Sequence, residues 1–303
     1  MGSGAPACYG RAAVKVLLGL LQTMRPHQWV KNLVVLGPLV FAHQLLNFEV
    51  AMRALAAFAL FSLLASAIYV LNDIVDVEAD RKHPVKKLRP IPAGTVPMHV
   101  AKGAFAALLS VVVTGGALLS PWFLAAALGY LVLNLAYSFK LKRVAYVDVL
   151  CIALGFELRV LAGAYASDVP PSGYLVVVMF LAAMFLGLGK RLHELGVTTQ
   201  GETRSVLRAY DPRVVTWLVS GFGVATGITY AIYTLDPETV ARFGTPYLVI
   251  SSIFVLFGLL RFVFLVRRRS HAESPTDAML RDLPFLLNLA LWAIAVTVIL
   301  YAA

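Results

Sequence analysis

Nine long apolar stretches constrain this 303-residue sequence more than any other feature. Each is 17 to 23 residues long, and a helix of about 20 apolar residues is enough to cross the hydrocarbon layer of a membrane. Of all residues, 60% are hydrophobic and 14% are charged, against roughly 45–50% and about 25% in a soluble domain. The sequence therefore predicts an all-α, polytopic membrane protein. The predicted spans are residues 31–47, 50–71, 98–119, 121–137, 146–166, 172–188, 213–235, 246–266 and 284–303.

The first 30 residues form a separate predicted segment. Arg11 and Lys15 precede a short apolar run, residues 16–21, and Arg25 follows soon after it. Such a run is too short for a cleaved signal and suits a helix lying on the membrane surface. We therefore expect an N-terminal interfacial segment, residues 1–30, followed by a nine-helix transmembrane catalytic domain, residues 31–303. The two cysteines, Cys8 and Cys151, indicate neither a disulfide framework nor a metal cluster.

The net charge of +10 is explained by the distribution of basic residues across the membrane. With the N-terminus in the cytoplasm, 22 of the 26 basic residues fall on one side of the membrane and Arg53 and Arg242 on the other, while Arg159 and Arg261 lie inside predicted spans. Cytoplasmic loops accumulate Lys and Arg, so no nucleic-acid partner is needed to explain the charge. The two longest loops lie on the basic side as well. This pattern predicts a polar site that faces the cytoplasm.

A carboxylate cluster follows the second predicted span. On a continuous helix, Asp73, Asp76 and Asp80 share a sector about 60° wide. Three like charges so placed repel one another unless a cation neutralises them, and Mg²⁺ prefers such oxygen ligands. The pattern predicts a metal site to which Asn72 adds a neutral oxygen ligand or a hydrogen-bond donor. The alternative is a solvated helix end whose acids pair with the basic residues that follow: Arg81, Lys82, Lys86 and Lys87.

Basic residues gather in three predicted loops of the same face. These are residues 81–89, 140–143 and 190–194. The segment 25–32, at the entry into the first span, is also rich in side chains that can donate hydrogen bonds to phosphate. Converging Lys and Arg around a metal-binding acid cluster would form a pocket for a phosphorylated substrate. The alternative is that they serve only as a topology signal.

The fifth predicted span holds two charges, Glu157 and Arg159. Charges at that depth are costly and usually face a polar cavity or one another. Residues two apart point to different faces of a helix, so a simple local ion pair is not expected. Lining a cavity and pairing with another helix both stay open.

Three motifs make the chain resemble the UbiA superfamily of intramembrane prenyltransferases over nearly its whole length. They are RPHQWVKN at 25–32, NDIVDVEADRKHPVKKLRPIPAG at 72–94 and YSFKLKRVAYVDVLCIALGFELRVLAG at 137–163. Within the superfamily they look most like the decaprenyl-phosphate phosphoribosyltransferases of mycobacteria and their relatives. Members that use a prenyl diphosphate donor carry an Asp-x-x-x-Asp motif after the sixth span. This chain departs from that pattern, with Lys190, Arg191, His193 and Glu194 in its place.

The resemblance implies transfer of 5-phosphoribosyl from phosphoribosyl pyrophosphate to a polyprenyl phosphate such as decaprenyl phosphate. The products would be polyprenyl-phosphoryl-5-phosphoribose and pyrophosphate, a step toward cell-wall arabinan in a bacterial plasma membrane. It implies Mg²⁺ as cofactor, held with the pyrophosphate by Asn72, Asp73, Asp76 and Asp80. Donor phosphates would meet Arg81, Lys82, Tyr137, Lys140 and Lys142. The acceptor phosphate or the 5-phosphate would meet Lys31, Lys190 and Arg191.

Three other functions compete with this one. The same scaffold could transfer a prenyl group from its diphosphate to an aromatic or alcohol acceptor. A transporter would show polar, broken helices at mid-membrane and repeated halves, whereas the polar residues here crowd one face. A CDP-alcohol phosphotransferase would need an Asp-Gly pair, which the sequence lacks. The wide apolar surface permits a homo-oligomer, although membrane lipids alone would satisfy it.

Overall fold

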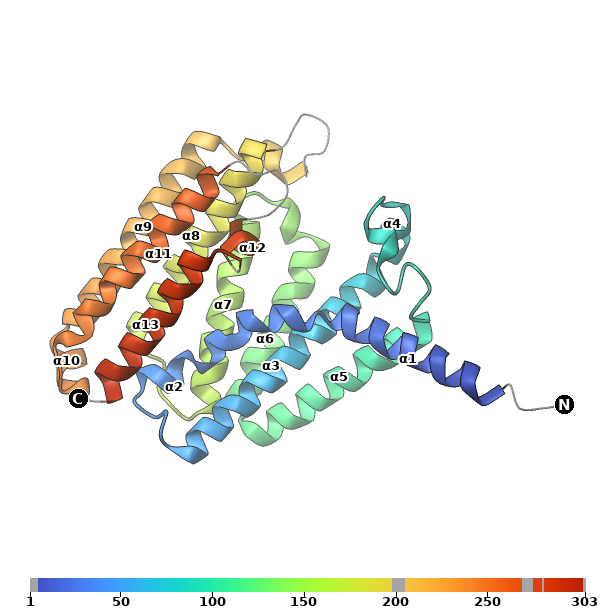
Figure 1. Ribbon diagram of the computed structural model, residues 1–303, viewed down its shortest axis with the longest axis horizontal. Helices are drawn as coiled ribbons and strands as arrows, with labels where there is room; N and C mark the ends of the chain where they lie inside the picture. Colours follow the sequence, from blue (N-terminus) through green and yellow to red (C-terminus); the bar gives the residue numbers. More distant parts are fainter. Residues whose placement is uncertain (1–4, 198–204, 269–274, 280, 302–303) are drawn as a thin grey trace. The chain divides into compact units, whose positions relative to one another are not determined.

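The computed structural model describes residues 5–197, 205–268, 275–279 and 281–301, and every regular element among them is helical (Figure 1). Seven helices in this part of the chain are long and apolar enough to cross a membrane. This confirms the all-α class, and the chain is a multi-pass membrane protein. The seven are Phe48–Val75, Met98–Leu119, Pro121–Phe139, Gly173–Gly196, Pro212–Leu235, Tyr247–Arg267 and Leu283–Tyr301.

The predicted count of nine spans is not confirmed. The first predicted span, 31–47, is not one helix, because a 3₁₀ helix, η1 (Pro26–Leu36), is followed by a short α2 (Gly37–Phe41). The Gly37 N–H donates a hydrogen bond to the Val34 carbonyl in the 3₁₀ pattern. Pro38, the second residue of α2, has no N–H, so it cannot donate a hydrogen bond back to η1. The fifth span is helical, as α7 (Val147–Ala166), but is not among the seven. The last two residues of the ninth, 302 and 303, lie outside the described residues.

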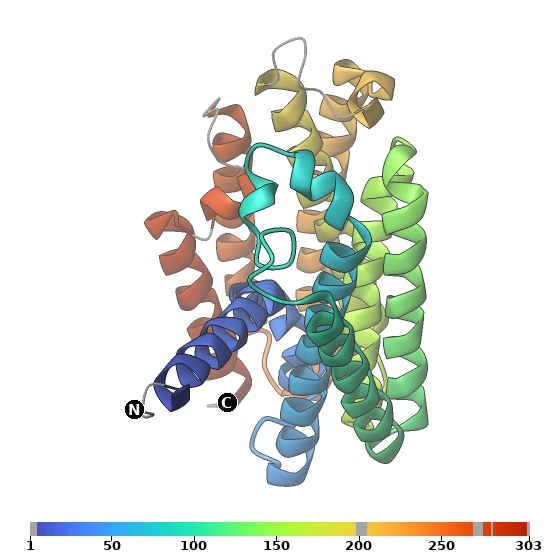
Figure 2. The ribbon, with the colours of Figure 1, turned by 90° about the vertical axis from the view of Figure 1, so that its right-hand side faces the viewer.

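The chain divides into two compact units, and each is described by itself. Unit 1 comprises Met1–Leu39, Asn47–Asn134 and Leu161–Val169. Its central helix, α3 (Phe48–Val75), packs against α5 (Met98–Leu119), η1 and α1 (Ala5–Met24). The Asn47 side chain caps α3 by accepting a hydrogen bond from the Val50 N–H. Short α4 (Val77–Lys82) and η2 (Lys86–Leu88) follow at the far end of α3, as Figure 2 shows.

One tight contact in unit 1 fixes the position of η1. A Cβ atom on Gly163, near the end of α7, would lie 1.9 Å from the Val35 carbonyl oxygen of η1. Only glycine permits two backbones to approach so closely. The 3₁₀ segment is therefore held against α7 by a contact that no other residue could make.

Unit 2 comprises Val40–Leu46, Leu135–Val160 and Pro170–Ala303. Within it α8 (Gly173–Val197) lies along α9 (Pro212–Leu235), and α11 (Ser252–Arg267) packs against α8, α9 and α13 (Leu283–Tyr301) (Figure 1). Asp211 caps α9, and Asp236 caps α10 (Pro237–Phe243). The helices α6 (Pro121–Phe139) and α7 belong partly to each unit. The remaining elements of unit 2 are η3 (Leu141–Arg143), η4 (Ser205–Ala209), η5 (Tyr247–Ser251) and α12 (Pro275–Met279).

The proposed division into residues 1–30 and 31–303 stays a prediction. Residues 5–24 are helical, as α1, which agrees with the helix expected there. Cys151 is buried, as suits an inert thiol. The side chains of Cys8 and Arg11 lie outside those that the structure describes.

Candidate active site

Two buried carboxylates meet one guanidinium at the end of α3. Asp73 and Asp80 are each 2% exposed. Arg89 Nη1 donates to Asp73 Oδ1 at 3.2 Å and to Asp80 Oδ2 at 2.7 Å, while Arg25 Nη2 donates to Asp73 Oδ1 at 3.0 Å. A buried carboxylate must be paired to stay charged. Arg89 therefore joins the two acids into one cluster.

Asp76 stands apart from this pair. It occupies the break between α3 and α4 with φ −86° and ψ 4°, so the continuous helix assumed from the sequence is interrupted there. The Asp76 side chain is half-buried and forms no ion pair within the described residues. Nor do the described residues contain a group of three His, Cys, Asp or Glu side chains arranged to hold a metal ion. The structure thus brings together two of the three predicted ligands.

The cations that pair with the acids are largely not those expected from the sequence. Lys86 lies 3.7 Å from Asp80, as the alternative interpretation required. Arg81 instead pairs with the exposed Glu78 at 2.7 Å, and Lys82 is exposed. Lys31 is exposed on η1. Their predicted contacts with phosphate stay predictions.

Sequence reasoning missed Arg25 and Arg89 as partners of the acids. Each directly precedes a proline, Pro26 or Pro90, and a residue before proline is disfavoured in α-helix. Arg25 adopts φ 53° between α1 and η1, and its guanidinium lies 4.8 Å from the centre of the Tyr69 ring. This strained backbone and the cation–π contact hold Arg25 over Asp73. The Arg-Pro pairs were the available signal.

The donor chemistry of this cluster fits a divalent cation. Asp73 and Asp80 offer hard carboxylate oxygens that converge on one positive group, and Mg²⁺ prefers such ligands shared with substrate phosphates. That position is held by Arg89 in this structure. The cluster thus suits one cation bound between two carboxylates rather than a metal site formed by three carboxylates.

A second buried charged cluster lies in unit 2. Asp148 of α7 is fully buried; its Oδ2 accepts a hydrogen bond from Arg191 Nε at 2.9 Å, and its Oδ1 accepts one from the Tyr210 hydroxyl. Tyr210 in turn accepts the N–H of Tyr146, while Arg191 also pairs with Glu194. These contacts fasten α8 and the segment before α9 to the start of α7. Arg191 therefore already has two carboxylate partners, and its predicted role toward a phosphate stays a prediction.

The other predicted residues of unit 2 lie in different surroundings. Lys140 is exposed after α6, whereas Tyr137, Lys142 and Lys190 are half-buried. Arg159 is buried and donates to the Gly155 carbonyl one turn earlier on α7. Both carboxylate oxygens of Glu157 are buried and have no hydrogen-bond partner in the part of the chain that the structure describes. Whether Glu157 lines a cavity or pairs with another helix stays a prediction.

Replacing Tyr210 with phenylalanine should lower stability. The variant loses a donor to a fully buried carboxylate and leaves the Tyr146 N–H without its acceptor, a change that costs about 1–3 kcal/mol. We expect the Tm to fall by several degrees. Tyr247→Phe is the control, because Tyr247 is 64% exposed, and an equal Tm for both variants would contradict the role of this bond.

The same bond predicts a pH dependence. Burial, together with the hydrogen bond to Asp148, raises the pKa of Tyr210 above its ordinary value. Its contribution to stability is thus complete below the pKa of an exposed tyrosine, about 10, and is lost as the pH rises through the higher folded value. The difference in Tm between wild type and Tyr210→Phe should therefore hold up to about pH 10 and shrink above it.

Residues 33–289 match the model of the UbiA prenyltransferase family, which is most of the chain. The chain belongs to the UbiA prenyltransferase family. The fold agrees: a UbiA homolog from Archaeoglobus fulgidus, solved bound to GPP and Mg²⁺, superposes with a TM-score of 0.67 at 19% identity. That comparison covers 92% of this chain and 99% of the homolog.

Two curated relatives of this UbiA-family chain share one name, decaprenyl-phosphate phosphoribosyltransferase. The protein from Mycobacterium tuberculosis is 32% identical, over 88% of this chain and 89% of its own length. The protein from Mycolicibacterium smegmatis is 36% identical, over 73% and 71%. The digeranylgeranylglyceryl phosphate synthase of Pyrococcus abyssi is 30% identical, over 69% and 75%. The family resemblance inferred from the sequence is confirmed.

Proposed function

We propose that this UbiA-family protein transfers 5-phosphoribosyl from phosphoribosyl pyrophosphate to a polyprenyl phosphate. The observation that carries the proposal is the similarity, over most of their length, to relatives named decaprenyl-phosphate phosphoribosyltransferase. The absence of a second acidic motif at residues 190–194 supports it. No comparison supports a transporter.

In the proposed reaction a phosphate oxygen of the polyprenyl phosphate attacks C1 of the phosphoribosyl group. The bond from C1 to the pyrophosphate oxygen breaks, and pyrophosphate leaves with the bonding electrons. No general base is required, because the attacking phosphate is already ionised. The chain has to bind two anionic substrates and stabilise the charge that develops on the leaving group.

The acid cluster of unit 1 is the proposed pyrophosphate site. Asp73 and Asp80, with Asp76 and Asn72 beside them, would hold Mg²⁺ together with the departing pyrophosphate. When bound, the ion would neutralise the charge of the leaving group. Arg25 and Arg89, already among the carboxylates, add positive charge at the same place. Their guanidinium groups suit bidentate contacts with phosphate oxygens.

The remaining predicted residues are proposed to bind the other phosphate groups of the substrates. Arg81, Lys82, Tyr137, Lys140 and Lys142 would contact the donor phosphates, and Lys31, Lys190 and Arg191 the acceptor phosphate or the 5-phosphate. Glu157, whose oxygens have no hydrogen-bond partner among the described residues, would accept hydrogen bonds from a polar substrate group. The site would face the cytoplasm, because the charge bias of the loops places the basic side there.

A transfer assay with purified protein tests the proposal. Labelled phosphoribosyl pyrophosphate, Mg²⁺ and polyprenyl monophosphate should yield a labelled product that partitions into organic solvent, and chelating Mg²⁺ should abolish it. Omitting the polyprenyl monophosphate controls for labelled lipid that arises otherwise. Transfer that instead needs a prenyl diphosphate and an aromatic or alcohol acceptor would reject the proposal in favour of ordinary prenyl transfer.

A further inference from the structure

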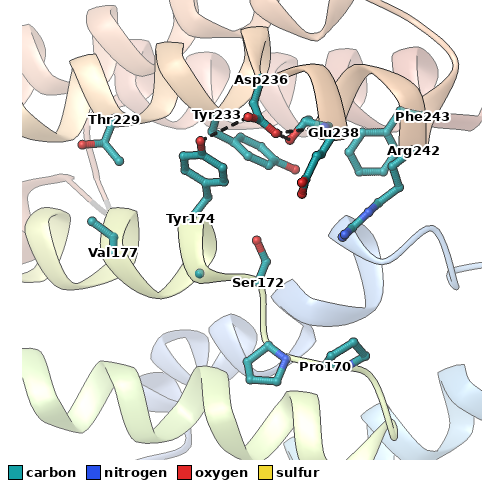
Figure 3. A pocket seen from close by; sticks show the side chains of 13 residues that line it. Pro170, Ser172, Tyr174, Val177, Thr229, Tyr233, Asp236, Glu238, Arg242 and Phe243 are labelled. Carbon is teal, nitrogen blue, oxygen red and sulfur yellow. Dashed lines mark hydrogen bonds between the residues drawn. The ribbon is translucent and has the colours of Figure 1, made fainter.

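A pocket of about 540 Å³, lined by both polar and apolar residues, lies in unit 2, far from its charged cluster. It is formed where α8 begins, α9 ends and α10 follows (Figure 3). Arg191 lies 18 residues after Gly173 along α8, a rise of about 27 Å. The pocket is therefore separated from Arg191 by about the thickness of the hydrocarbon layer, ~30 Å. It has no part in the proposed transfer reaction.

The pocket is held in shape by Asp236. One carboxylate oxygen accepts the Tyr174 hydroxyl at 3.4 Å, and the other accepts the Thr239 N–H at 3.1 Å and its hydroxyl at 3.3 Å. Tyr174 also packs against Tyr233, with ring centres 5.4 Å apart. The Asp236 oxygens are therefore already used within the protein, and the two tyrosine rings form a fixed aromatic wall.

Two opposite charges of the pocket remain available to a ligand. Glu238 and Arg242 lie four residues apart on α10, a spacing that allows an ion pair. Both are exposed, and neither side chain forms an ion pair or hydrogen bond with the described residues. Figure 3 shows both charged ends extending toward the same space, opposite Ser172. The pocket thus offers one carboxylate and one guanidinium to a single ligand.

The surroundings of the pocket point to a lipid. Val177 of α8, which lines the pocket, is 47% exposed, and Ile232 and Leu235 in the last turn of α9 are 52% and 59% exposed. In a membrane such residues meet acyl chains, and the end of a spanning helix lies at the level of the headgroups. A headgroup entering this pocket would keep its acyl chains on α8 and α9.

We propose that this pocket binds the headgroup of an aminophospholipid, with its ammonium at Glu238 and its phosphate at Arg242. The three N–H donors of a primary ammonium suit the carboxylate, and the rings of Tyr174 and Tyr233 attract a cation. The guanidinium suits a phosphate. A headgroup that carries phosphate but no amine would leave Glu238 facing an anion, and a trimethylated amine would lack the N–H donors.

Native mass spectrometry of the delipidated full-length chain tests this proposal. The probes are phosphatidylethanolamine, phosphatidylcholine and phosphatidylglycerol with identical acyl chains. We expect one tightly bound phosphatidylethanolamine, with an apparent Kd about tenfold below that of either other lipid. Glu238→Gln and Arg242→Gln should each raise that Kd about tenfold, the effect of losing one charge-assisted contact.

Glu49→Gln is the matched control. Glu49 is an exposed acid in the first turn of α3, in unit 1, and does not line the pocket, so this variant should bind phosphatidylethanolamine as the wild type does. Circular dichroism and Tm of the lipid-free variants check that each has folded. Equal affinity for all three lipids, a preference for phosphatidylglycerol, or unchanged binding by both pocket variants would each overturn the proposal.

Discussion

Replacing Asp73 with asparagine is expected to lower the rate of phosphoribosyl transfer by about 10³-fold. The substitution keeps the shape of the side chain but removes the charge that pairs with Arg25 and Arg89. Asparagine would be a poorer ligand for Mg²⁺, and the arginines would lose the carboxylate that positions them. Single-turnover assays at saturating substrates measure the effect on the transfer step.

Glu78→Gln is the control for this experiment. Glu78 belongs to the same acidic segment but is exposed and pairs only with Arg81 among the described residues, so its replacement should change the rate less than threefold. Because Asp73 is buried, its variant will also lose some stability, and the assay is therefore run well below the Tm of both proteins. An Asp73→Asn enzyme with near wild-type turnover would remove this cluster from the proposed mechanism.

Replacing Gly163 with alanine is expected to lower the free energy of unfolding by about 3 kcal/mol, the largest loss of stability among the variants proposed. The added methyl group would lie 1.9 Å from the Val35 carbonyl oxygen, and this neighbour is backbone that cannot rotate away. Either η1 or the end of α7 must move. The Tm of the purified protein should fall by many degrees.

Gly103→Ala provides the matched control. Gly103 lies inside α5, and a Cβ atom there would meet nothing within 4 Å. Alanine has a higher helix propensity than glycine, so this variant should be unchanged or more stable by up to about 1 kcal/mol. If the two variants had equal Tm values, the close approach of η1 to α7 would be refuted.

The sequence predicted the helices that are long and uniformly apolar. Seven of the nine expected spans correspond to helices able to cross a membrane, because hydropathy alone is a strong signal over about 20 residues. The first span was wrong as a single helix. Its apolar composition is right, but the 3₁₀ conformation that ends at Gly37 depends on backbone geometry and on the close approach of Val35 to Gly163, more than a hundred residues away.

The sequence indicated which acidic residues gather near the end of α3, but not which cations pair with them. Asp73 and Asp80 do bind one guanidinium, but they belong to two helices, α3 and α4, and Asp76 falls at the break between them, which no periodicity showed. The choice of Arg89 over its basic neighbours depends on the path of the loop after α4. Likewise, nothing local in the sequence indicated that Asp148 would bind both Arg191 and Tyr210.

The ion pairs of Asp73 and Asp80 have a consequence for purification of the protein. In many small metalloproteins the ion is part of the fold, and chelators denature them. Here three cations of the protein, Arg25, Lys86 and Arg89, already pair with the two buried acids, so we expect the fold to be kept without an added ion. Purification in EDTA should therefore yield folded but inactive protein, and adding Mg²⁺ should restore its activity.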